Sequence, residues 1–212
     1  MIKIEHLSKS FGAQIVLRDI SCRFATGKIH GLVGNNGSGK TVLMKCICGF
    51  LRPDHGFLWI DGKRVGKDFD FPPSLGMILE TPGFLPRRSG YGNLKLLASL
   101  QSKIGRAEIE TAMEKVGLDP HLKKPVAKYS LGMRQRLGIA QALMEDPDLL
   151  LFDEPFNGLD KQGITEIRAL MLSLKRAGKT ILLASHNPAD ISALCDTVHE
   201  IDSGELRCIT AP

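Results

Sequence analysis

The sequence lacks an apolar run that could cross a membrane. About 20 consecutive apolar residues are needed to span a bilayer, and no segment of the 212 residues approaches that length. The first six residues alternate apolar and polar side chains and lack the apolar core of a signal peptide. Internal repeats and low-complexity linkers are also missing. With 43% hydrophobic and 24% charged residues, we expect a soluble, cytoplasmic chain that is long enough for one full-sized domain or two small ones.

Cysteines are few, and blocks of charge are absent. The five cysteines are an odd number, and Cys46 and Cys48 lie two residues apart, which on a helix places them on different faces. We therefore expect reduced thiols and no metal site built from them. The net charge is +5, but the basic residues form scattered pairs without interleaved aromatic residues. Nucleic-acid grooves usually combine basic stripes with aromatic platforms, so the pattern argues against a nucleic-acid partner.

The apolar pattern predicts an α/β core. Strands are expected at 2–6, 15–24, 29–33, 57–60, 75–79, 148–152, 180–184 and 197–201. Helices are expected after Lys40, after Ser130, and from Ile164 to a stop near Gly178. The strands 148–152 and 180–184 are almost wholly apolar, which is typical of a parallel sheet covered on both faces. The helix between them completes a right-handed βαβ unit.

Residues 85–146 interrupt this pattern, because they contain no comparable strand and are mostly helical in periodicity. We interpret them as a helical subdomain inserted into the α/β core. The whole chain, residues 1–212, is then expected to be a single domain that contains this insertion.

A phosphate loop is predicted at Gly34-Asn35-Asn36-Gly37-Ser38-Gly39-Lys40-Thr41, which matches the pattern G-x-x-x-x-G-K followed by Ser or Thr. A strand precedes it and a helix that includes Val42 follows, as the pattern requires. Glycines let backbone N–H groups turn toward phosphate oxygens, and the helix N-terminus favours an anion. We expect Lys40 to reach the β- and γ-phosphates and the Thr41 hydroxyl to ligate Mg²⁺. The segment predicts a nucleoside triphosphate site.

Two acidic residues support this prediction. Asp153 and Glu154 directly follow the apolar strand that ends at Phe152. Carboxylates at the end of a buried strand are costly to desolvate unless a cation accompanies them. We expect Asp153 to hold Mg²⁺ and Glu154 to act as general base, or to orient the water that attacks the γ-phosphate. A solvated surface turn is the alternative, and the neighbouring phosphate loop disfavours it.

Further motifs distinguish among the phosphate-loop families. Tyr129-Ser130-Leu131-Gly132-Met133, followed by a basic helix, resembles the signature of ATP-binding cassette (ABC) proteins, usually L-S-G-G-Q. Asn157-Gly158-Leu159-Asp160 resembles their D-loop, His186 stands at the place of their switch histidine, and Phe11 matches their adenine-stacking aromatic. The resemblance covers nearly the whole chain. It implies ATP and Mg²⁺ as ligands and a P-loop ABC fold, with an antiparallel β subdomain and the helical insertion.

The resemblance also implies a dimer in which two cassettes, identical or sister chains, pack head to tail around ATP. Ser130 and Gly132 of one subunit would contact the γ-phosphate held by the other. Ser130 can cap a helix whose N-terminus faces an anion, and Gly132 allows a close backbone approach. Asp160 would help to form the interface and couple the two sites, and His186 would take part in catalysis. An ordinary hydrogen-bonded histidine and a core aromatic remain the alternatives for His186 and Phe11.

Three positions depart from the family pattern. Leu131 and Met133 replace the usual Gly and Gln of the signature. Glu80, before Thr81-Pro82-Gly83, stands where the family usually carries a glutamine that touches Mg²⁺ and the attacking water. A carboxylate there keeps a ligating oxygen but would repel a phosphate charge by roughly 4 kcal/mol at about 4 Å and an effective dielectric constant near 20. We hypothesise that Glu80 ligates Mg²⁺ and the nucleotide as a sensor; the alternative is a side chain turned to solvent.

The leading functional interpretation is the ATPase subunit of a transporter, acting at the inner face of the cell membrane with a separate multi-span membrane subunit. The segments around Glu80 and Ser130 resemble the branch that exports, or confers immunity to, bacitracin and lantibiotic peptides. Leu94, Leu97 and Leu100 recur at helical spacing and could offer a docking surface, but core packing is the preferred interpretation for each of them. A soluble ABC ATPase in translation, repair or cofactor assembly is the second hypothesis. A small-molecule kinase ranks last, because it would leave the signature unexplained.

Overall fold

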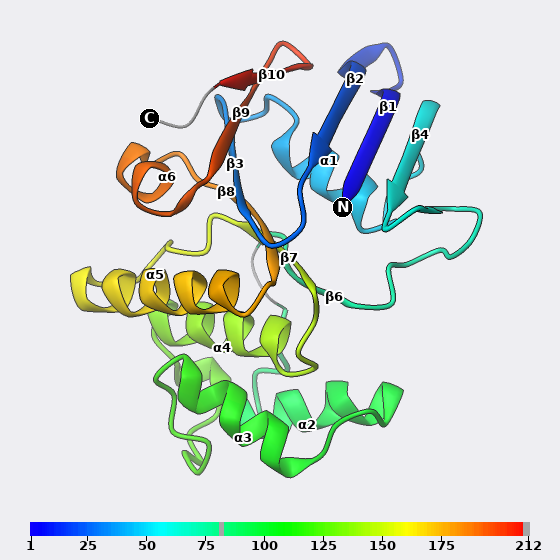
Figure 1. Cartoon of the computed structure of the whole chain (residues 1–212). Coiled ribbons are helices and arrows are strands. Elements are labelled where there is room, and N and C mark those ends of the chain that lie inside the picture. Colours follow the sequence, from blue (N-terminus) through cyan, green and yellow to red (C-terminus); the bar gives the residue numbers. More distant parts are fainter. Residues whose placement is uncertain (81–82, 210–212) are drawn as a thin grey trace.

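Two β-sheets and a group of helices make up the molecule (Figure 1). The computed structural model describes residues 1–80 and 83–209. The strands are β1 (Ile2–Phe11), β2 (Gln14–Phe24), β3 (Ile29–Val33), β4 (His55–Ile60), β5 (Lys63–Arg64), β6 (Leu75–Ile78), β7 (Leu149–Asp153), β8 (Thr180–Ala184), β9 (Thr197–Asp202) and β10 (Glu205–Ile209). The helices are α1 (Lys40–Ile47), α2 (Gly90–Gln101), α3 (Arg106–Lys115), the 3₁₀ turn η1 (Val126–Lys128), α4 (Leu131–Leu143), α5 (Lys161–Arg176) and α6 (Pro188–Leu194).

The larger sheet has the strand order β10-β9-β3-β8-β7-β6 and is parallel except for the edge strand β10, which pairs antiparallel with β9. The smaller sheet has the order β2-β1-β4-β5 and is antiparallel throughout. Helices α2 to α5 lie on one side of the larger sheet, and the smaller sheet lies on the other (Figure 1). This arrangement confirms the predicted α/β fold with an antiparallel β subdomain and a helical insertion.

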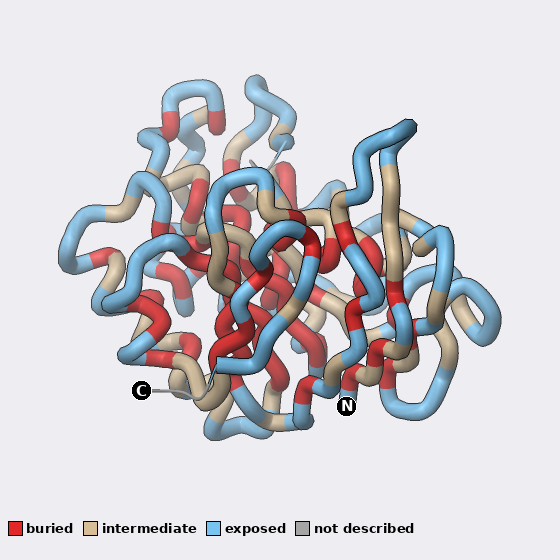
Figure 2. The backbone as a smooth tube through the Cα atoms, turned by 90° about the horizontal axis from the view of Figure 1, so that it is seen from above, coloured by how far each residue is buried: buried red, intermediate tan, exposed pale blue. Residues whose placement is uncertain are grey.

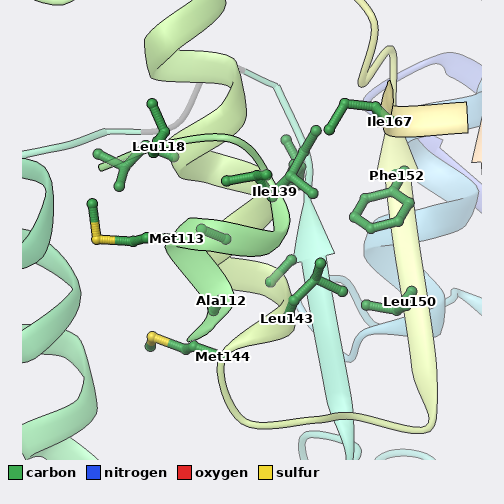
Figure 3. Packing of buried hydrophobic residues seen from close by; sticks show 14 of the residues in the cluster. Ala112, Met113, Leu118, Ile139, Leu143, Met144, Leu150, Phe152 and Ile167 are labelled. Atoms are coloured by element: carbon green, nitrogen blue, oxygen red, sulfur yellow. The ribbon is translucent and has the colours of Figure 1, made fainter. Parts of the chain in front are cut away.

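Alternate side chains of the central strands enter two different cores. Leu149 and Leu151 of β7 pack with the smaller sheet and α1, whereas Leu150 and Phe152 pack against the helices. The second group is seen in Figure 3, where both side chains face residues of α4 such as Leu143. Because both faces of each central strand are buried, these strands need continuous apolar sequence. In Figure 2 the buried residues lie in the interior of the molecule and the exposed residues lie mainly at the turns.

The predicted segments match the observed elements closely, with four differences. β1 continues to Phe11, well beyond the predicted end at residue 6, because its second half is only partly buried and loses the apolar alternation. The two-residue strand β5, the edge strand β10 and the seven-residue helix α6 were not predicted. These elements are too short or too exposed to show a clear hydrophobic period.

The three leucines of α2 do not form one exposed stripe. Leu94 is fully buried, and Leu97 is partly buried against the same core. Leu100 is 77% exposed. Core packing, the preferred interpretation, is therefore confirmed for Leu94 and Leu97, and the docking surface is wrong for these two residues. No helix among the described residues is long and apolar enough to cross a bilayer.

Two buried histidines, His30 and His199, lie against Phe24, the last residue of β2. His30 on β3 contacts the Oγ1 of Thr197 through Nδ1 at 2.6 Å and the carbonyl oxygen of Ala25 through Nε2 at 2.8 Å. His199 on β9 is only 5% exposed, and its ring centroid lies 4.8 Å from that of Phe24. Its Nδ1 is buried without a hydrogen-bond partner among the described residues. Burial disfavours the charged imidazolium and lowers the pKa of both histidines, that of His199 to about 4.

Candidate active site

The predicted phosphate loop connects β3 to α1, and its glycines are required by close backbone contacts. Gly34 has φ +145°, and a Cβ atom there would lie 2.3 Å from the carbonyl oxygen of Ile201. Gly39 has φ +112°, and a Cβ atom would lie 2.8 Å from a methyl carbon of Leu17 on β2. Both positions therefore exclude any side chain. The loop is held between the two sheets and leads into the N-terminus of α1, and a helix N-terminus favours an anion.

Lys40 and Ser38 place buried polar groups in this loop. The Lys40 ammonium group is buried and donates to the carbonyl oxygens of Gly34 at 2.8 Å and Asn35 at 3.0 Å. Ser38 Oγ is buried without a hydrogen-bond partner in the part of the chain that the structure describes. A buried hydroxyl is normally hydrogen-bonded. An oxygen-rich anion such as a phosphate would supply the missing acceptor and a second set of ligands for the ammonium group.

Thr41 and Asp153 meet across the loop and the sheet. The Thr41 hydroxyl donates to Asp153 Oδ2 at 2.5 Å, although the two residues are 112 positions apart in sequence. Asp153 is the last residue of β7, so its position depends on the apolar strand that places it at the carboxyl edge of the sheet. A hydroxyl and a carboxylate are oxygen ligands of the kind that Mg²⁺ prefers.

Glu154 and His186 form the second pair. Glu154 Oε2 lies 2.8 Å from His186 Nδ1, at the adjacent ends of β7 and β8. Glu154 has φ +50°, a left-handed conformation that costs a residue with a Cβ atom about 1–2 kcal/mol. Its N–H donates to the carbonyl oxygen of Ala184, which fixes this turn. The predicted general base and the predicted switch histidine are thus in direct contact.

A buried ion pair supports the segment that carries His186. Arg168 on α5 donates to Asp190 Oδ1 at 2.5 Å, and Asp190 is only 2% exposed. The other oxygen of Asp190 accepts from the Ser185 hydroxyl, and Ser185 Oγ accepts from the N–H of Asn187. The sequence reasoning missed this network, because Arg168 looks like any solvated residue on an amphipathic helix.

Glu80 enters the site from β6, two residues beyond the end of the strand. Its φ is +64°, and its Oε1 accepts from Lys45 Nζ of α1 at 2.6 Å. The side chain is 64% exposed, but it lines the same cavity as the phosphate loop. Thr81 and Pro82 of the predicted turn lie outside the described residues.

The signature residues lie at the N-terminus of α4. Ser130 caps this helix by accepting from the N–H of Met133 at 3.1 Å. A Cβ atom at Gly132 would lie 2.8 Å from the carbonyl oxygen of Gly158, so α4 packs directly on the segment 157–160. Asp160 caps α5 by accepting from the N–H of Gly163 at 2.8 Å. Ser130, Gly132 and Asp160 do not line the phosphate cavity of their own chain.

Phe11 lies apart from the phosphate cavity. It ends β1, is 48% exposed, and its ring is 5.6 Å from the ammonium group of Lys9. The interpretation as a core aromatic is therefore wrong, whereas its role in stacking on adenine stays a prediction.

Part of the predicted set lines one cavity of about 640 Å³. Of the predicted set, its wall contains Asn36, Gly37, Gly39, Lys40, Thr41, Val42, Glu80, Asp153 and Glu154. His186, Gly34 and Asn35 line an adjoining cavity of about 870 Å³, to which Asn36 also contributes. Val16, Leu131, Gln135 and Asn157 line the first cavity and were absent from the predicted binding set. Leu131 and Asn157 lay in quoted motifs without an assigned binding role, Gln135 lies in the basic helix that follows the signature, and no signal in the sequence pointed to Val16.

The residues around this cavity fit Mg²⁺ bound together with a phosphate ligand. No group of three or more His, Cys, Asp or Glu side chains in the described residues could hold a metal by itself. Mg²⁺ usually takes only one or two protein carboxylates and completes its shell with water and phosphate oxygens. Thr41, Asp153 and Glu80 provide such an incomplete set of oxygen ligands at the wall of one cavity.

Comparisons with known proteins agree with the motifs. A family model described as ABC transporter matches residues 17–157. An ABC transporter ATP-binding protein of Bacillus subtilis, YybJ, is 40% identical, over 98% of this chain and 95% of the relative. The bacitracin transport ATP-binding protein BcrA of Enterococcus faecalis is also 40% identical, over 97% and 68%. The lantibiotic transport ATP-binding protein SrtF of Streptococcus pyogenes is 36% identical, over 97% and 89%.

Solved structures show the same fold. The structure of an ATP-binding subunit of an ABC transporter has a TM-score of 0.88 and 29% identity, and the match covers 99% of this chain and 90% of that one. A dimeric ATP-binding cassette bound to ADP and phosphate has a TM-score of 0.89 at 20% identity, with coverage of 100% and 99%. The chain therefore has the fold of these ATP-binding cassettes.

Proposed function

The chain belongs to the ABC transporter family as an ATP-binding and ATP-hydrolysing subunit, and we propose that the residues around its phosphate loop carry out the hydrolysis. The observation that supports this most directly is that two pairs of interacting side chains lie side by side at one edge of the larger sheet. Thr41 and Asp153 are in contact at the phosphate loop, and Glu154 and His186 are in contact beside them.

Binding is assigned to the loop and its helix. Backbone N–H groups of residues 34–41 and the start of α1 hold the triphosphate, and the orphaned Ser38 hydroxyl donates to a phosphate oxygen. Lys40 exchanges its two carbonyl contacts for β- and γ-phosphate oxygens. Thr41, Asp153 and Glu80 are the ligands available to Mg²⁺, which when bound neutralises charge on the β- and γ-phosphates. Phe11 stacks on the adenine ring.

Hydrolysis is assigned to Glu154 and His186. The Glu154 carboxylate accepts a proton from the attacking water, or orients that water, while one of its oxygens is fixed by the His186 ring. His186 in turn is held by the segment that the Arg168–Asp190 pair anchors. Positioning of water and base, rather than covalent chemistry by the protein, is what phosphoryl transfer requires.

The assembly follows from the position of the signature. ABC ATP-binding subunits dimerise and work with membrane subunits. Ser130 and Gly132 stand at an exposed helix N-terminus outside their own phosphate cavity. We assign them to the γ-phosphate of a second cassette packed head to tail, with Asp160 at the interface. Closure around ATP and opening after hydrolysis would then drive a multi-span partner at the inner face of the membrane.

The transported cargo is assigned from the relatives. Two of the relatives described above are named for bacitracin and lantibiotic transport. We propose export of, or immunity to, antimicrobial peptides of these two classes. The relatives give no support to the alternative of a non-transport ATPase, and the family assignment excludes the kinase. A strain that lacks the gene should become more sensitive to bacitracin or to a lantibiotic; unchanged sensitivity to both would contradict this cargo.

Replacing Glu154 by Gln tests the enzymatic assignment. The amide keeps the size and the contact with His186 but cannot accept a proton, so ATP turnover should fall about 10²- to 10⁴-fold. ATP binding should persist, and an ATP-bound dimer should accumulate in size-exclusion chromatography. Glu114→Gln, which changes an exposed carboxylate on α3, is the matched control. Wild-type turnover in the Glu154 variant would show that another group is the base.

A further inference from the structure

Glu80 adds a third carboxylate to the wall of a cavity that already contains two. It lines the phosphate cavity together with Asp153 and Glu154. A bound triphosphate would add several negative charges at the same wall. Like charges within a few ångströms repel strongly when they are partly shielded from water. A carboxylate at position 80 therefore needs compensation that a neutral glutamine would not.

Lys45 is placed to provide this compensation. Its Nζ lies 2.6 Å from Glu80 Oε1, and the two residues are 35 positions apart in sequence. Lys45 follows Thr41 by four residues on α1, so it lies on the same helix face, one turn farther from the phosphate loop. Glu80 lines the cavity and Lys45 does not. The ammonium group therefore contacts the carboxylate from outside the cavity.

The other oxygen of Glu80 keeps its ligand capacity. Within residues 1–80 and 83–209, Lys45 is the one side chain that hydrogen-bonds to the Glu80 carboxylate, and it does so through Oε1 alone. Lys40, the other nearby ammonium group, is occupied by the carbonyl oxygens of Gly34 and Asn35. The side chains of Lys45 and Glu80 are 30% and 64% exposed. An ion pair this exposed contributes little to fold stability, so its main effect is on the local potential.

We propose that Lys45 is the counter-ion of Glu80, and that the pair acts as a neutral oxygen ligand at the nucleotide site. Its net charge is zero, as that of a glutamine amide would be, and its uncommitted carboxylate oxygen is available to the cavity. Lys45 is thus a positioning residue that touches neither nucleotide nor metal. The proposal rests on the proposed function, since it requires that ATP binds in this cavity.

A double-mutant cycle tests the coupling. Four proteins are compared: wild type, Lys45→Met, Glu80→Gln and the double variant. Their affinities for ATP are measured by calorimetry, first with EDTA and then with excess Mg²⁺. With EDTA, Lys45→Met should weaken ATP binding roughly three- to tenfold when Glu80 is present, because the released carboxylate can then approach the phosphates. In the Glu80→Gln background no carboxylate is released, and the loss should be less than about twofold. Mg²⁺ should reduce the first effect, because a second cation then neutralises Glu80.

Two controls separate charge from structure. Lys45→Arg keeps the charge and should bind ATP like wild type. Lys175→Met breaks an ion pair with Asp196 of the same length, 2.6 Å, from a lysine that is equally exposed, and it lies outside the cavity. It should leave the affinity for ATP unchanged. Thermal unfolding confirms that each variant is folded.

The outcomes distinguish this proposal from the proposed function. Lys45→Met could weaken ATP binding at least as much in the Glu80→Gln background as in the wild-type background. That result would mean that Lys45 attracts the nucleotide directly, and it would overturn the proposal. No loss in either background would overturn it as well. If wild type binds ATP and Lys40→Ala abolishes that binding, the proposed function stands whatever the cycle shows. If wild type does not bind ATP, the proposed function itself fails.

Discussion

Acid should destabilise the fold through His199. This imidazole is 5% exposed, its Nδ1 has no hydrogen-bond partner among the described residues, and its pKa is lowered to about 4 by burial and by the neighbouring His30. In the unfolded chain its pKa returns to about 6.5. Between these values the unfolded state binds a proton that the folded state does not. The free energy of unfolding therefore falls as the pH falls from about 6.5 to about 4.

The size of the effect follows from the same two pKa values. The difference of about 2.5 between the folded and unfolded pKa values of His199 corresponds to about 3 kcal/mol of stability in total, and about 2 kcal/mol of it should be lost by about pH 5. The lowered pKa of His30 adds to the loss in the same direction. Since a domain of this kind is stable by about 5–15 kcal/mol, the effect is large enough to measure.

Urea unfolding at neutral pH and at about pH 5 provides the assay. In His199→Asn the titrating group is gone, so the loss of stability between the two pH values should shrink by about 2 kcal/mol relative to wild type. The comparison uses the change with pH, so the cost of the substitution itself cancels. His55→Asn, at an exposed position of β4, is the control and should keep the wild-type change. An unaltered pH dependence in His199→Asn would refute the reasoning.

Two further substitutions test the supports of the site. Gly34→Ala should abolish ATP binding in an equilibrium binding assay and lower the melting temperature. The reason is that its Cβ atom would lie 2.3 Å from the Ile201 carbonyl oxygen, in a backbone conformation that alanine disfavours. The control Gly62→Ala also has a positive φ but has open space around it, so this variant should fold and bind ATP normally. Arg168→Leu should cost about 3–5 kcal/mol in chemical unfolding, because Asp190 is left buried without its charge partner. In the double variant with Asp190→Asn much of that cost should be recovered, and no recovery would contradict an electrostatic origin.

The sequence predicts most of the fold because its central strands are long apolar runs. β3, β7 and β8 lie within one residue of the predicted positions. α6 was missed although Asn187 caps it and Pro188 starts it, since seven residues are too few for a hydrophobic period. β10 was missed because it is an exposed edge strand with only weak alternation. β10 therefore depends on its pairing with β9 rather than on a local signal.

Site residues could be predicted where neighbouring residues in one short motif act together. The phosphate loop and the Asp153–Glu154 pair could be assigned from spacing alone. Contacts between distant segments could not, and the contact of Lys45 with Glu80 is the clearest case. Neither residue has a sequence neighbour that points to the other, because α1 and β6 are brought together only by the sheet. The same applies to Val16, which reaches the cavity through the close approach of β2 to Gly39.

In the larger sheet the functional residues lie at or after the strand ends, whereas the residues that stabilise the fold lie in the strand interiors. β3, β8, β7 and β6 are adjacent and parallel, so the phosphate loop, His186, Asp153–Glu154 and Glu80 all follow neighbouring strands at one edge. Neighbouring strands are about 4.8 Å apart, so the whole row spans about 14 Å. Each functional group lies at or after the end of a strand, so replacing it does not alter the packing of the apolar residues within that strand. A lineage could therefore replace the group at one end, such as glutamine by glutamate at position 80, without repacking either core, and new enzymatic behaviour would arise at almost no risk to folding.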